Sequence, residues 1–193
     1  MAPELIAATV CSANPHKLAE FHELFPGFEL ELLDGPELPE EDGETYRENA
    51  MIKARFGHRV GPPGRVMLAD DSGIEVAALG GAPGVRTARW AEGRHVEKLL
   101  AALDGADDRR ARYVCELVAV DPDGSESFGR GVLDGHIARA PAGDEGFGFD
   151  PVFVPEGEER TVAQLGDAWK AEHSHRALAA HALLDRLELQ GRG

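Results

Sequence analysis

The sequence has few cysteines, few lysines and no long apolar segment, and each shortage narrows the class of protein. No apolar run approaches the roughly 18–20 residues that a membrane-spanning helix needs. No basic segment precedes an apolar stretch near the N-terminus, so we expect no secretory signal and a cytoplasmic location. The two cysteines, Cys11 and Cys115, lie in apolar, strand-like runs. This placement favours buried reduced thiols over a disulfide.

Positive charge is also scarce, since the formal net charge is −15. Phosphate backbones and acidic membranes attract basic patches, so we expect neither duplex nucleic acid nor a membrane as a partner. Only four of the 20 basic residues are lysines: Lys17, Lys53, Lys98 and Lys170. They either mark sites that suit a compact point charge or reflect coding bias and chance. An anionic ligand would need such cations gathered locally against the field of the whole protein.

Length and composition indicate one globular domain, residues 1–193, because 42% hydrophobic residues suffice for a core. Periodicity and turn residues predict strands over 5–11, 28–33, 66–69, 74–79, 112–120, 125–133 and 152–154. They predict helices over 15–25, 46–60, 96–103, 161–165 and 175–189. Strands and helices mix without strict alternation, which indicates an α/β fold with a mixed sheet.

Residues 12–17 follow the first apolar run and open the first helix, with Asn14 as its cap and Pro15 at its first position. Lys17 then occupies about the third helical position. The helix dipole disfavours a cation there unless an anion occupies the helix mouth, so the pattern indicates a phosphate site. The alternative is a solvated lysine, since a lone Asn-x-x-Lys is weakly specific.

Asp70 and Asp71 follow another apolar run, in a segment (70–73) that we predict to be the exit loop of a strand. Adjacent carboxylates repel each other, and Mg²⁺ relieves this repulsion while keeping positions for water and phosphate oxygens. Neighbouring strand residues point to opposite faces of a sheet. We therefore expect one aspartate to bind metal or water and the other to have a structural role. The alternative is an Asp-Asp-Ser-Gly turn with no ligand.

An acidic loop, residues 34–43, precedes a helix that starts with the capping box Thr45 and Glu48. The run 40–42 is a candidate source of a metal carboxylate, although such runs are more often solvated. Lys53 lies on the helix one turn beyond Asn49. It would reach the phosphates if the loop reaches the metal, and otherwise it is a surface lysine.

Residues 146–151 form a glycine-rich turn that carries two aromatic side chains, Phe147 and Phe149. Glycines let a flat ligand approach closely, and an aromatic ring stacked on a base contributes about 1–3 kcal/mol. The alternative is that both rings fill the core.

Residues 169–176 gather cations and donors just before the last helix. Zinc binding by His173 and His175 is disfavoured, because residues i and i+2 of a helix point apart and no third ligand is close. Donors that read a base edge or a phosphate fit this segment better.

These motifs, in this order, resemble those of the inosine triphosphate pyrophosphatase family, which hydrolyses non-standard purine nucleoside triphosphates. The resemblance spans residues 5–189. Each motif alone is weakly specific, but the motifs together are highly specific. The resemblance rests on residues 12–17, 41–53, 69–73, 80–84, 146–153, 170 and 174–176.

The resemblance implies an elongated α/β fold, with two lobes around a central cleft, and usually a homodimer. It also implies Mg²⁺-dependent hydrolysis between the α- and β-phosphates, which gives a nucleoside monophosphate and pyrophosphate. Asp71 would be the general base and a metal ligand, Glu41 the second metal carboxylate, and Phe149 the ring that stacks on the base. The residues implied in substrate binding are Ser12, Asn14, Lys17, Lys53, Asp70, Ser72, Phe147, Gly148, Phe149, Asp150, Lys170, His175 and Arg176.

Three features depart from the family pattern. Ala13 replaces a usual glycine beside the phosphates, and Phe149 replaces a frequent Tyr or Trp, which removes a polar tip. The stretch after Trp90, residues 91–96, is shorter than usual, which affects the expected lobe shape and dimer contact.

Two other functions stay open on the residues alone. A phosphatase with Asp70 or Asp71 as nucleophile would release orthophosphate, although that class usually has Asp-x-Asp spacing. A nucleotide-binding regulator would bind the triphosphate without turnover. Neither Gly-x-x-x-x-Gly-Lys-Ser/Thr nor Gly-x-Ser-x-Gly occurs, so a P-loop and a serine nucleophile elbow are not indicated.

Overall fold

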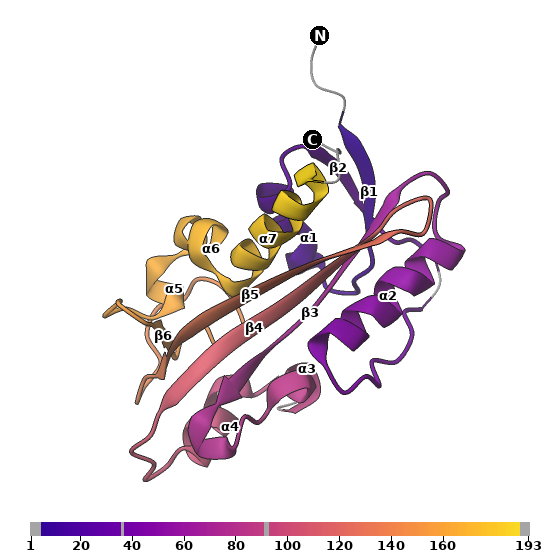
Figure 1. Cartoon of the computed structure of the whole chain (residues 1–193). Coiled ribbons are helices and arrows are strands. Elements are labelled where there is room, and N and C mark those ends of the chain that lie inside the picture. Colours follow the sequence, from indigo (N-terminus) through magenta and orange to yellow (C-terminus); the bar gives the residue numbers. More distant parts are fainter. Residues whose placement is uncertain (1–4, 36, 91–92, 190–193) are drawn as a thin grey trace. The chain divides into compact units, whose positions relative to one another are not determined.

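A computed structural model describes residues 5–35, 37–90 and 93–189 (Figure 1). Its strands are β1 (Ile6–Val10), β2 (Phe28–Leu32), β3 (Val66–Val76), β4 (Arg110–Val120), β5 (Glu126–Ile137) and β6 (Phe153–Pro155). Its α-helices are α1 (Pro15–Leu24), α2 (Tyr46–Val60), α3 (Thr87–Trp90), α4 (His95–Ala102), α5 (Val162–Leu165), α6 (Asp167–His173) and α7 (His175–Leu189). Two short 3-10 helices, η1 (Ala77–Leu79) and η2 (Gly84–Arg86), lie between β3 and α3.

The six strands form one mixed sheet in the order β2-β1-β3-β4-β5-β6. β1 runs parallel to both of its neighbours, so Ala8 lies opposite Leu30 of β2 and Val66 of β3. β6 runs antiparallel to β5, with Ile137 opposite Phe153. The predicted α/β fold with a mixed sheet is therefore confirmed.

Local sequence signals explain where several elements begin. Thr45 Oγ1 accepts a hydrogen bond from the Glu48 backbone N–H at 3.2 Å, and Glu48 Oε2 accepts one from the Thr45 N–H at 3.0 Å. This predicted capping box starts α2. In the turn that joins β4 to β5, the Asp121 N–H donates to the Ser125 carbonyl at 2.9 Å. The predicted helices 46–60 and 175–189 coincide with α2 and α7.

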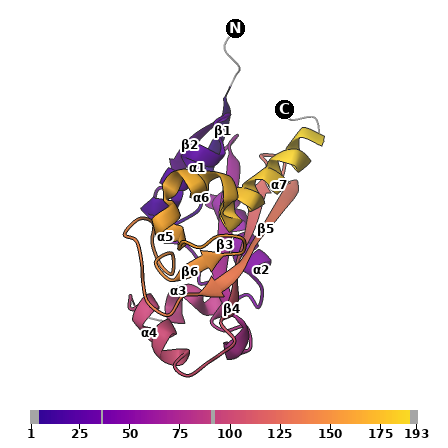
Figure 2. The same cartoon turned by 90° about the vertical axis from the view of Figure 1, so that its left-hand side faces the viewer.

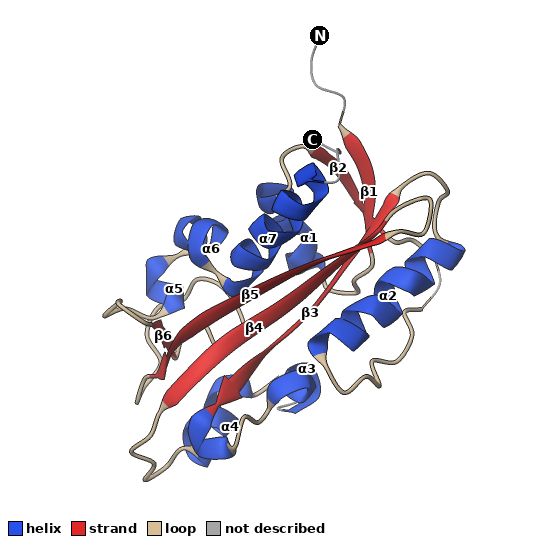
Figure 3. Ribbon diagram, viewed as in Figure 1, coloured by secondary structure: helices blue, strands red, loops and turns tan. Residues whose placement is uncertain are grey.

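The predicted exit loop at residues 70–73 is wrong, because β3 continues through it to Val76 as one strand (Figure 3). Pairing with β1 ends at Leu68, and β4 lies beside β3 as its other neighbour. Pairing within the sheet therefore outweighs the turn signal of Asp-Asp-Ser-Gly. The expected strand over 74–79 is confirmed for residues 74–76, which end β3, and wrong for residues 77–79, which form η1.

Two further findings concern the helices. α6 was not among the expected helices, because its seven residues carry no clear apolar stripe. In the part of the chain that the structure describes, we find no helix with the length and apolar character to cross a membrane.

The chain divides into two compact units. Unit 1 comprises residues 1–71, 115–131 and 178–193, and unit 2 comprises 72–114 and 132–177. β3, β4 and β5 each contribute residues to both units. The expectation of a single domain with two lobes around a cleft stays a prediction.

Unit 1 has helices on both faces of its strands. α2 lies on one face, and α1 and α7 lie on the other (Figures 1 and 2). On the α2 face, Cys11, Ala50, Ala54 and Met67 belong to one buried apolar cluster. A Cβ added at Gly57 of α2 would overlap the sulfur of Cys11. Small side chains on the inner face of α2 thus let the helix approach the sheet closely.

Both cysteines are buried thiols outside any disulfide, as predicted. Burial raises the pKa of Cys11 to about 12, although the charge of Lys53 opposes this shift. A thiol in the unfolded chain titrates near about pH 8.5, so above that pH the unfolded state loses a proton that the folded state keeps. This difference lowers stability as the pH rises from about 8.5 toward 12.

We therefore expect the free energy of unfolding to fall between pH 8 and pH 10.5 by about 1–3 kcal/mol more in the wild type than in Cys11→Ala. Urea titrations of both proteins at the two pH values measure this difference. Equal losses in the two proteins would contradict the assignment to Cys11.

Unit 2 packs around one apolar cluster. Its buried members include Ile74 of β3, Leu99 of α4, Phe153 of β6 and Val162 of α5. The cluster thus joins strands to the short helices that flank them. The short stretch 91–96 noted in the sequence includes residues 91 and 92, which lie outside the described residues.

Candidate active site

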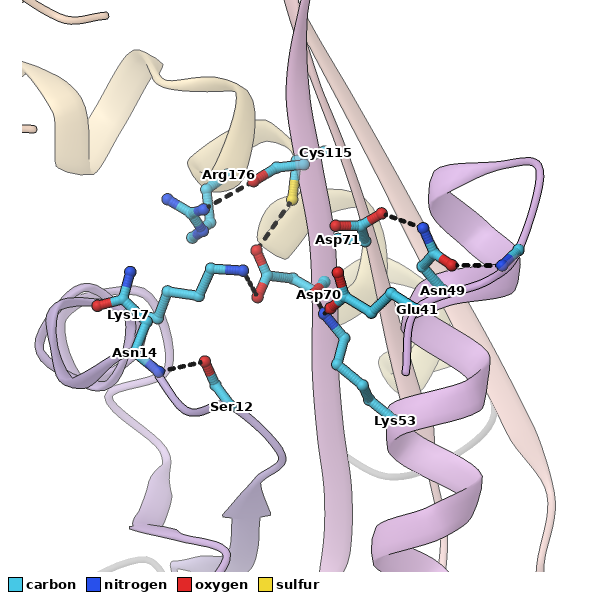
Figure 4. A network of polar contacts seen from close by, with 12 residues as sticks. Ser12, Asn14, Lys17, Glu41, Asn49, Lys53, Asp70, Asp71, Cys115 and Arg176 are labelled. Atoms are coloured by element: carbon cyan, nitrogen blue, oxygen red, sulfur yellow. Dashed lines mark hydrogen bonds and ion pairs between the residues drawn. The ribbon is translucent and has the colours of Figure 1, made fainter. Parts of the chain in front are cut away.

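Asp70 and Asp71 are neighbours in β3 and point to opposite faces of the strand (Figure 4). Asp70 Oδ1 accepts a hydrogen bond from Lys17 Nζ of α1 at 2.8 Å, and Asp70 Oδ2 lies 3.9 Å from Cys115 Sγ of β4. Asp71 Oδ2 accepts a hydrogen bond from Asn49 Nδ2 of α2 at 3.0 Å. Both carboxylates are buried, and each has different partners.

Lys53 is a buried cation rather than a surface lysine, with 5% of the residue exposed. Its Nζ donates to Glu41 Oε1 at 2.5 Å and to the Asp70 backbone carbonyl at 2.6 Å. Burial lowers the pKa of Lys53, but the charges of Asp70, Glu41 and Asp71 outweigh burial and raise it above the usual value. The ammonium group therefore stays charged, and the acidic loop does reach Lys53.

Asn49 is a site residue that sequence reasoning missed. Its fully buried side chain donates to Asp71 through Nδ2 and accepts the Gly43 backbone N–H through Oδ1 at 2.9 Å. Asn49 thus ties the acidic loop to Asp71. A polar side chain on the inner face of an amphipathic helix was the available signal, because buried amides need partners.

Burial raises the pKa of Asp71 above the usual value for an aspartate, and repulsion from Glu41 adds to this rise. Lys53, the hydrogen bond from Asn49 and Lys17 act in the opposite direction without cancelling it. The charges of Lys17, Glu41 and Lys53 therefore all act on Asp71. A carboxylate with a raised pKa is a better proton acceptor near neutral pH.

The donor set of unit 1 fits a divalent cation held jointly with a polyphosphate. Within residues 5–35, 37–90 and 93–189, no three His, Cys, Asp or Glu side chains form a ready metal cluster. Mg²⁺ does not need one, because it takes one or two carboxylates and completes its shell with water and phosphate oxygens. Glu41 and Asp71 supply two carboxylates that repel each other.

Ser12 and Asn14 shape the entry to α1. Ser12 Oγ accepts a hydrogen bond from the Asn14 N–H at 3.1 Å, and the Asn14 carbonyl accepts one from the Lys17 N–H at 3.1 Å. Lys17 is the third residue of α1, as predicted, and its ammonium group contacts Asp70. The first turn of α1 therefore directs a cation toward β3.

Asp150 organises the glycine-rich turn of unit 2. Its Oδ2 accepts hydrogen bonds from the Phe147 N–H at 2.9 Å and from Lys170 Nζ at 3.0 Å. Its Oδ1 accepts one from the Tyr113 hydroxyl at 3.2 Å. Gly146 has a φ of 75°, and a Cβ there would overlap the Asp150 carboxylate, so this turn requires glycine.

The two aromatic rings of this turn have different surroundings. Phe149 is 2% exposed and packs against His95, with ring centroids 5.4 Å apart, and against Trp90, at 6.5 Å. Phe147 is 38% exposed, and its ring centroid lies 4.5 Å from Lys170 Nζ. The expectation that Phe149 stacks on a base does not fit this burial, because its ring already fills the core. Phe147 presents the accessible ring.

Ser72, His175 and Arg176 also lie in unit 2. Arg176 Nη2 donates to Ser72 Oγ at 3.1 Å. The ring of His175 stacks on that of Tyr113, with centroids 4.6 Å apart and planes 9° from parallel. Gly148 has a φ of 65°, and the position of its missing Cβ is open space. The first turn of α7 is thus tied to β3 and to β4.

Each unit gathers a part of the predicted site. Unit 1 holds the candidates for phosphate and metal, which are Ser12, Asn14, Lys17, Glu41, Lys53, Asp70 and Asp71. Unit 2 holds the other candidates for substrate binding, which are Ser72, Phe147, Gly148, Phe149, Asp150, Lys170, His175 and Arg176.

Comparisons with known proteins agree with the resemblance seen in the motifs. The model of the Ham1 family matches residues 8–186. A dITP/XTP pyrophosphatase of Leifsonia xyli is 40% identical over 200 residues, covering 97% of this chain and 98% of that protein. A dITP/XTP pyrophosphatase of Mycobacterium tuberculosis is 44% identical over 192 residues, covering 92% of this chain and 93% of that protein. The solved Ham1 protein of Staphylococcus aureus aligns with a TM-score of 0.81 at 33% identity, covering 97% of this chain and all of that chain. The chain belongs to the Ham1 family.

Proposed function

We propose that this protein hydrolyses non-standard purine nucleoside triphosphates, namely dITP, XTP and ITP, to the nucleoside monophosphate and pyrophosphate. Full-length similarity to dITP/XTP pyrophosphatases supports this function. The observation that carries the proposal is the group of opposite charges in unit 1. Lys17 and Lys53 are held against the carboxylates of Asp70 and Glu41 in a protein of strong net negative charge.

In unit 1, Asp71 takes the proton of the attacking water or orients that water, because its raised pKa suits a proton acceptor. Lys17 and Lys53 bind the phosphates and stabilise the charge that develops on the departing pyrophosphate. Ser12 and Asn14 bind phosphate at the entry to α1. Mg²⁺, held by Glu41 and Asp71, would acidify a bound water and neutralise phosphate charge.

In unit 2, Phe147 rather than Phe149 stacks on the base, since Phe147 has the exposed ring. Lys170, His175 and Arg176 donate to the edge of the purine. A 6-oxo purine presents an acceptor where adenine presents a donor, so a site built from donors favours the former. Such a site can favour a 6-oxo purine over adenine by about 10⁴-fold or more.

Three further expectations stay predictions: Mg²⁺ as the cofactor, a homodimer and a cytoplasmic location. Ser72 and Gly148 belong to the proposed base site, and Asp150 supports it through Phe147 and Lys170.

The deciding experiment is a product analysis with a panel of triphosphates. With Mg²⁺, we expect ITP, dITP and XTP to yield one monophosphate and one pyrophosphate per turnover, and ATP to be hydrolysed far more slowly. Chromatography of the nucleotides, together with separate assays for pyrophosphate and orthophosphate, measures this. Parallel reactions with excess chelator test the need for a divalent cation.

Successive release of orthophosphate would instead support the phosphatase alternative. Binding of ITP without any turnover would support the regulator. Either result would contradict the proposed function.

A further inference from the structure

Tyr113 is a buried tyrosine of β4 that the proposed function does not use. The residue is 7% exposed and lies in the apolar cluster of unit 2. On sequence alone it is an ordinary core aromatic of a strand. Its polar and ring contacts, however, lead to both segments proposed to recognise the base.

The hydroxyl of Tyr113 contacts the glycine-rich turn. It donates to Asp150 Oδ1 at 3.2 Å. Burial and the charge of Asp150 raise the pKa of Tyr113 well above its usual range, so the hydroxyl keeps its proton.

Asp150 also contacts Phe147 and Lys170, the groups proposed to face the ligand. Its other oxygen accepts from the Phe147 N–H at 2.9 Å and from Lys170 Nζ at 3.0 Å. The same Nζ lies 4.5 Å from the centroid of the Phe147 ring. Tyr113, Asp150, Lys170 and Phe147 therefore form one connected chain of contacts that ends at an exposed aromatic face.

The ring of Tyr113 contacts the second segment. It stacks on His175 with centroids 4.6 Å apart and planes 9° from parallel, and it also packs on Phe153 at 4.6 Å. Stacking of this kind restrains the orientation of the imidazole ring.

We propose that Tyr113 is a positioning residue for base recognition in unit 2. Its hydroxyl holds Asp150 in the orientation that places Phe147 and Lys170, and its ring holds His175. The inference rests on the proposed function, because it assigns Tyr113 to the same base site.

The variant Tyr113→Phe removes the hydroxyl and keeps the ring, so the stack on His175 survives. A hydrogen bond to a charged group is worth about a tenfold change or more in an equilibrium constant. We expect KM for ITP to rise about tenfold, kcat to change by less than about threefold, and the preference for ITP over ATP to narrow. A role confined to core packing would instead lower the melting temperature and leave KM unchanged.

A double-mutant cycle tests whether Tyr113 acts through Asp150. If it does, Tyr113→Phe adds little to the rise in KM that Asp150→Asn causes alone. If the two substitutions instead multiply in their effects on KM, the inference is overturned.

Tyr46→Phe is the matched control, because it removes the other tyrosine hydroxyl of the chain, which is also buried but lies in α2 of unit 1. An equal rise in KM in this control would overturn the inference as well.

Hydrogen exchange without any ligand separates this inference from the proposed function. We expect amides of residues 146–150 to exchange faster in Tyr113→Phe than in the wild type, while α2 is unchanged. Unchanged exchange at 146–150 would overturn the positioning role even if ITP is a substrate. Absence of pyrophosphate release by the wild type would overturn the proposed function and leave this measurement decisive for Tyr113.

Discussion

Replacing Asp71 by asparagine should reduce the rate of pyrophosphate release from ITP by about 10²–10⁴-fold, the usual contribution of a general base. Asparagine has nearly the same shape, and its carbonyl oxygen can still accept the hydrogen bond from Asn49. It cannot take a proton, and it removes one of the two carboxylates proposed to hold Mg²⁺. The loss should therefore appear mainly in kcat, with much of the nucleotide affinity retained.

Two measurements separate the effect on turnover from the effect on binding. Turnover of ITP is followed by pyrophosphate release, and affinity is measured by calorimetry with an α,β-methylene analogue that resists hydrolysis. Asp108→Asn is a suitable control, because Asp108 is a more exposed carboxylate that pairs with Arg110 and belongs to no proposed site. A rate for Asp71→Asn within a few-fold of the wild type would place the base elsewhere.

The same variant bears on the regulator alternative. An enzyme loses turnover and keeps binding when its base is removed, whereas a regulator has no turnover to lose. The wild type must therefore hydrolyse ITP before the variant is informative. The chemistry favours turnover, because Asp71 sits where burial and Glu41 raise its pKa while cations proposed to bind phosphate lie nearby.

Local signals made much of the fold predictable. α2 begins at a capping box whose two residues satisfy each other's backbone donors, so its start needs no tertiary information. The entry to α1 was also readable, because Asn14 and Pro15 favour a helix start whatever surrounds them. The Asp-Pro-Asp-Gly turn between β4 and β5 is of the same kind.

The parts that failed depend on partners distant in sequence. Residues 70–73 resemble a turn by composition, yet they remain in β3, which has β4 as a neighbour in the sheet. The two buried aspartates have partners in Lys17, Asn49 and Cys115, between 22 and 53 positions away. No local pattern shows that an amide of α2 will meet a carboxylate of β3.

The two rings of the glycine-rich turn show the same limit at close range. Phe147 and Phe149 are two residues apart and have similar neighbours in sequence. Only the contacts of Phe149 with Trp90 and His95 reveal which ring is buried. The sequence could identify a turn suited to a flat ligand, but it could not show which of the two rings is exposed.

Replacing Gly129 by alanine should destabilise the protein by about 2–3 kcal/mol, although alanine normally suits a strand better than glycine. Gly129 lies in β5, directly beneath α7. A Cβ there would overlap the Ala179 carbonyl oxygen and lie 2.7 Å from the Leu183 backbone nitrogen and 2.8 Å from its Cβ. These overlaps involve mainly backbone atoms of a helix, so rotation of a flexible side chain cannot relieve them. The helix α7 must therefore shift.

For a chain of this length the melting temperature should fall by about 5–10 °C, which calorimetry measures directly. Gly27→Ala is the matched control in unit 1, because a Cβ at Gly27 meets no atom within 4 Å and its φ is not positive. That change should alter stability by no more than about 0.5 kcal/mol. Since α7 begins with His175 and Arg176, a displaced helix should also weaken binding of the base. A Gly129→Ala protein as stable as Gly27→Ala would mean that α7 does not need the close approach seen at Gly129.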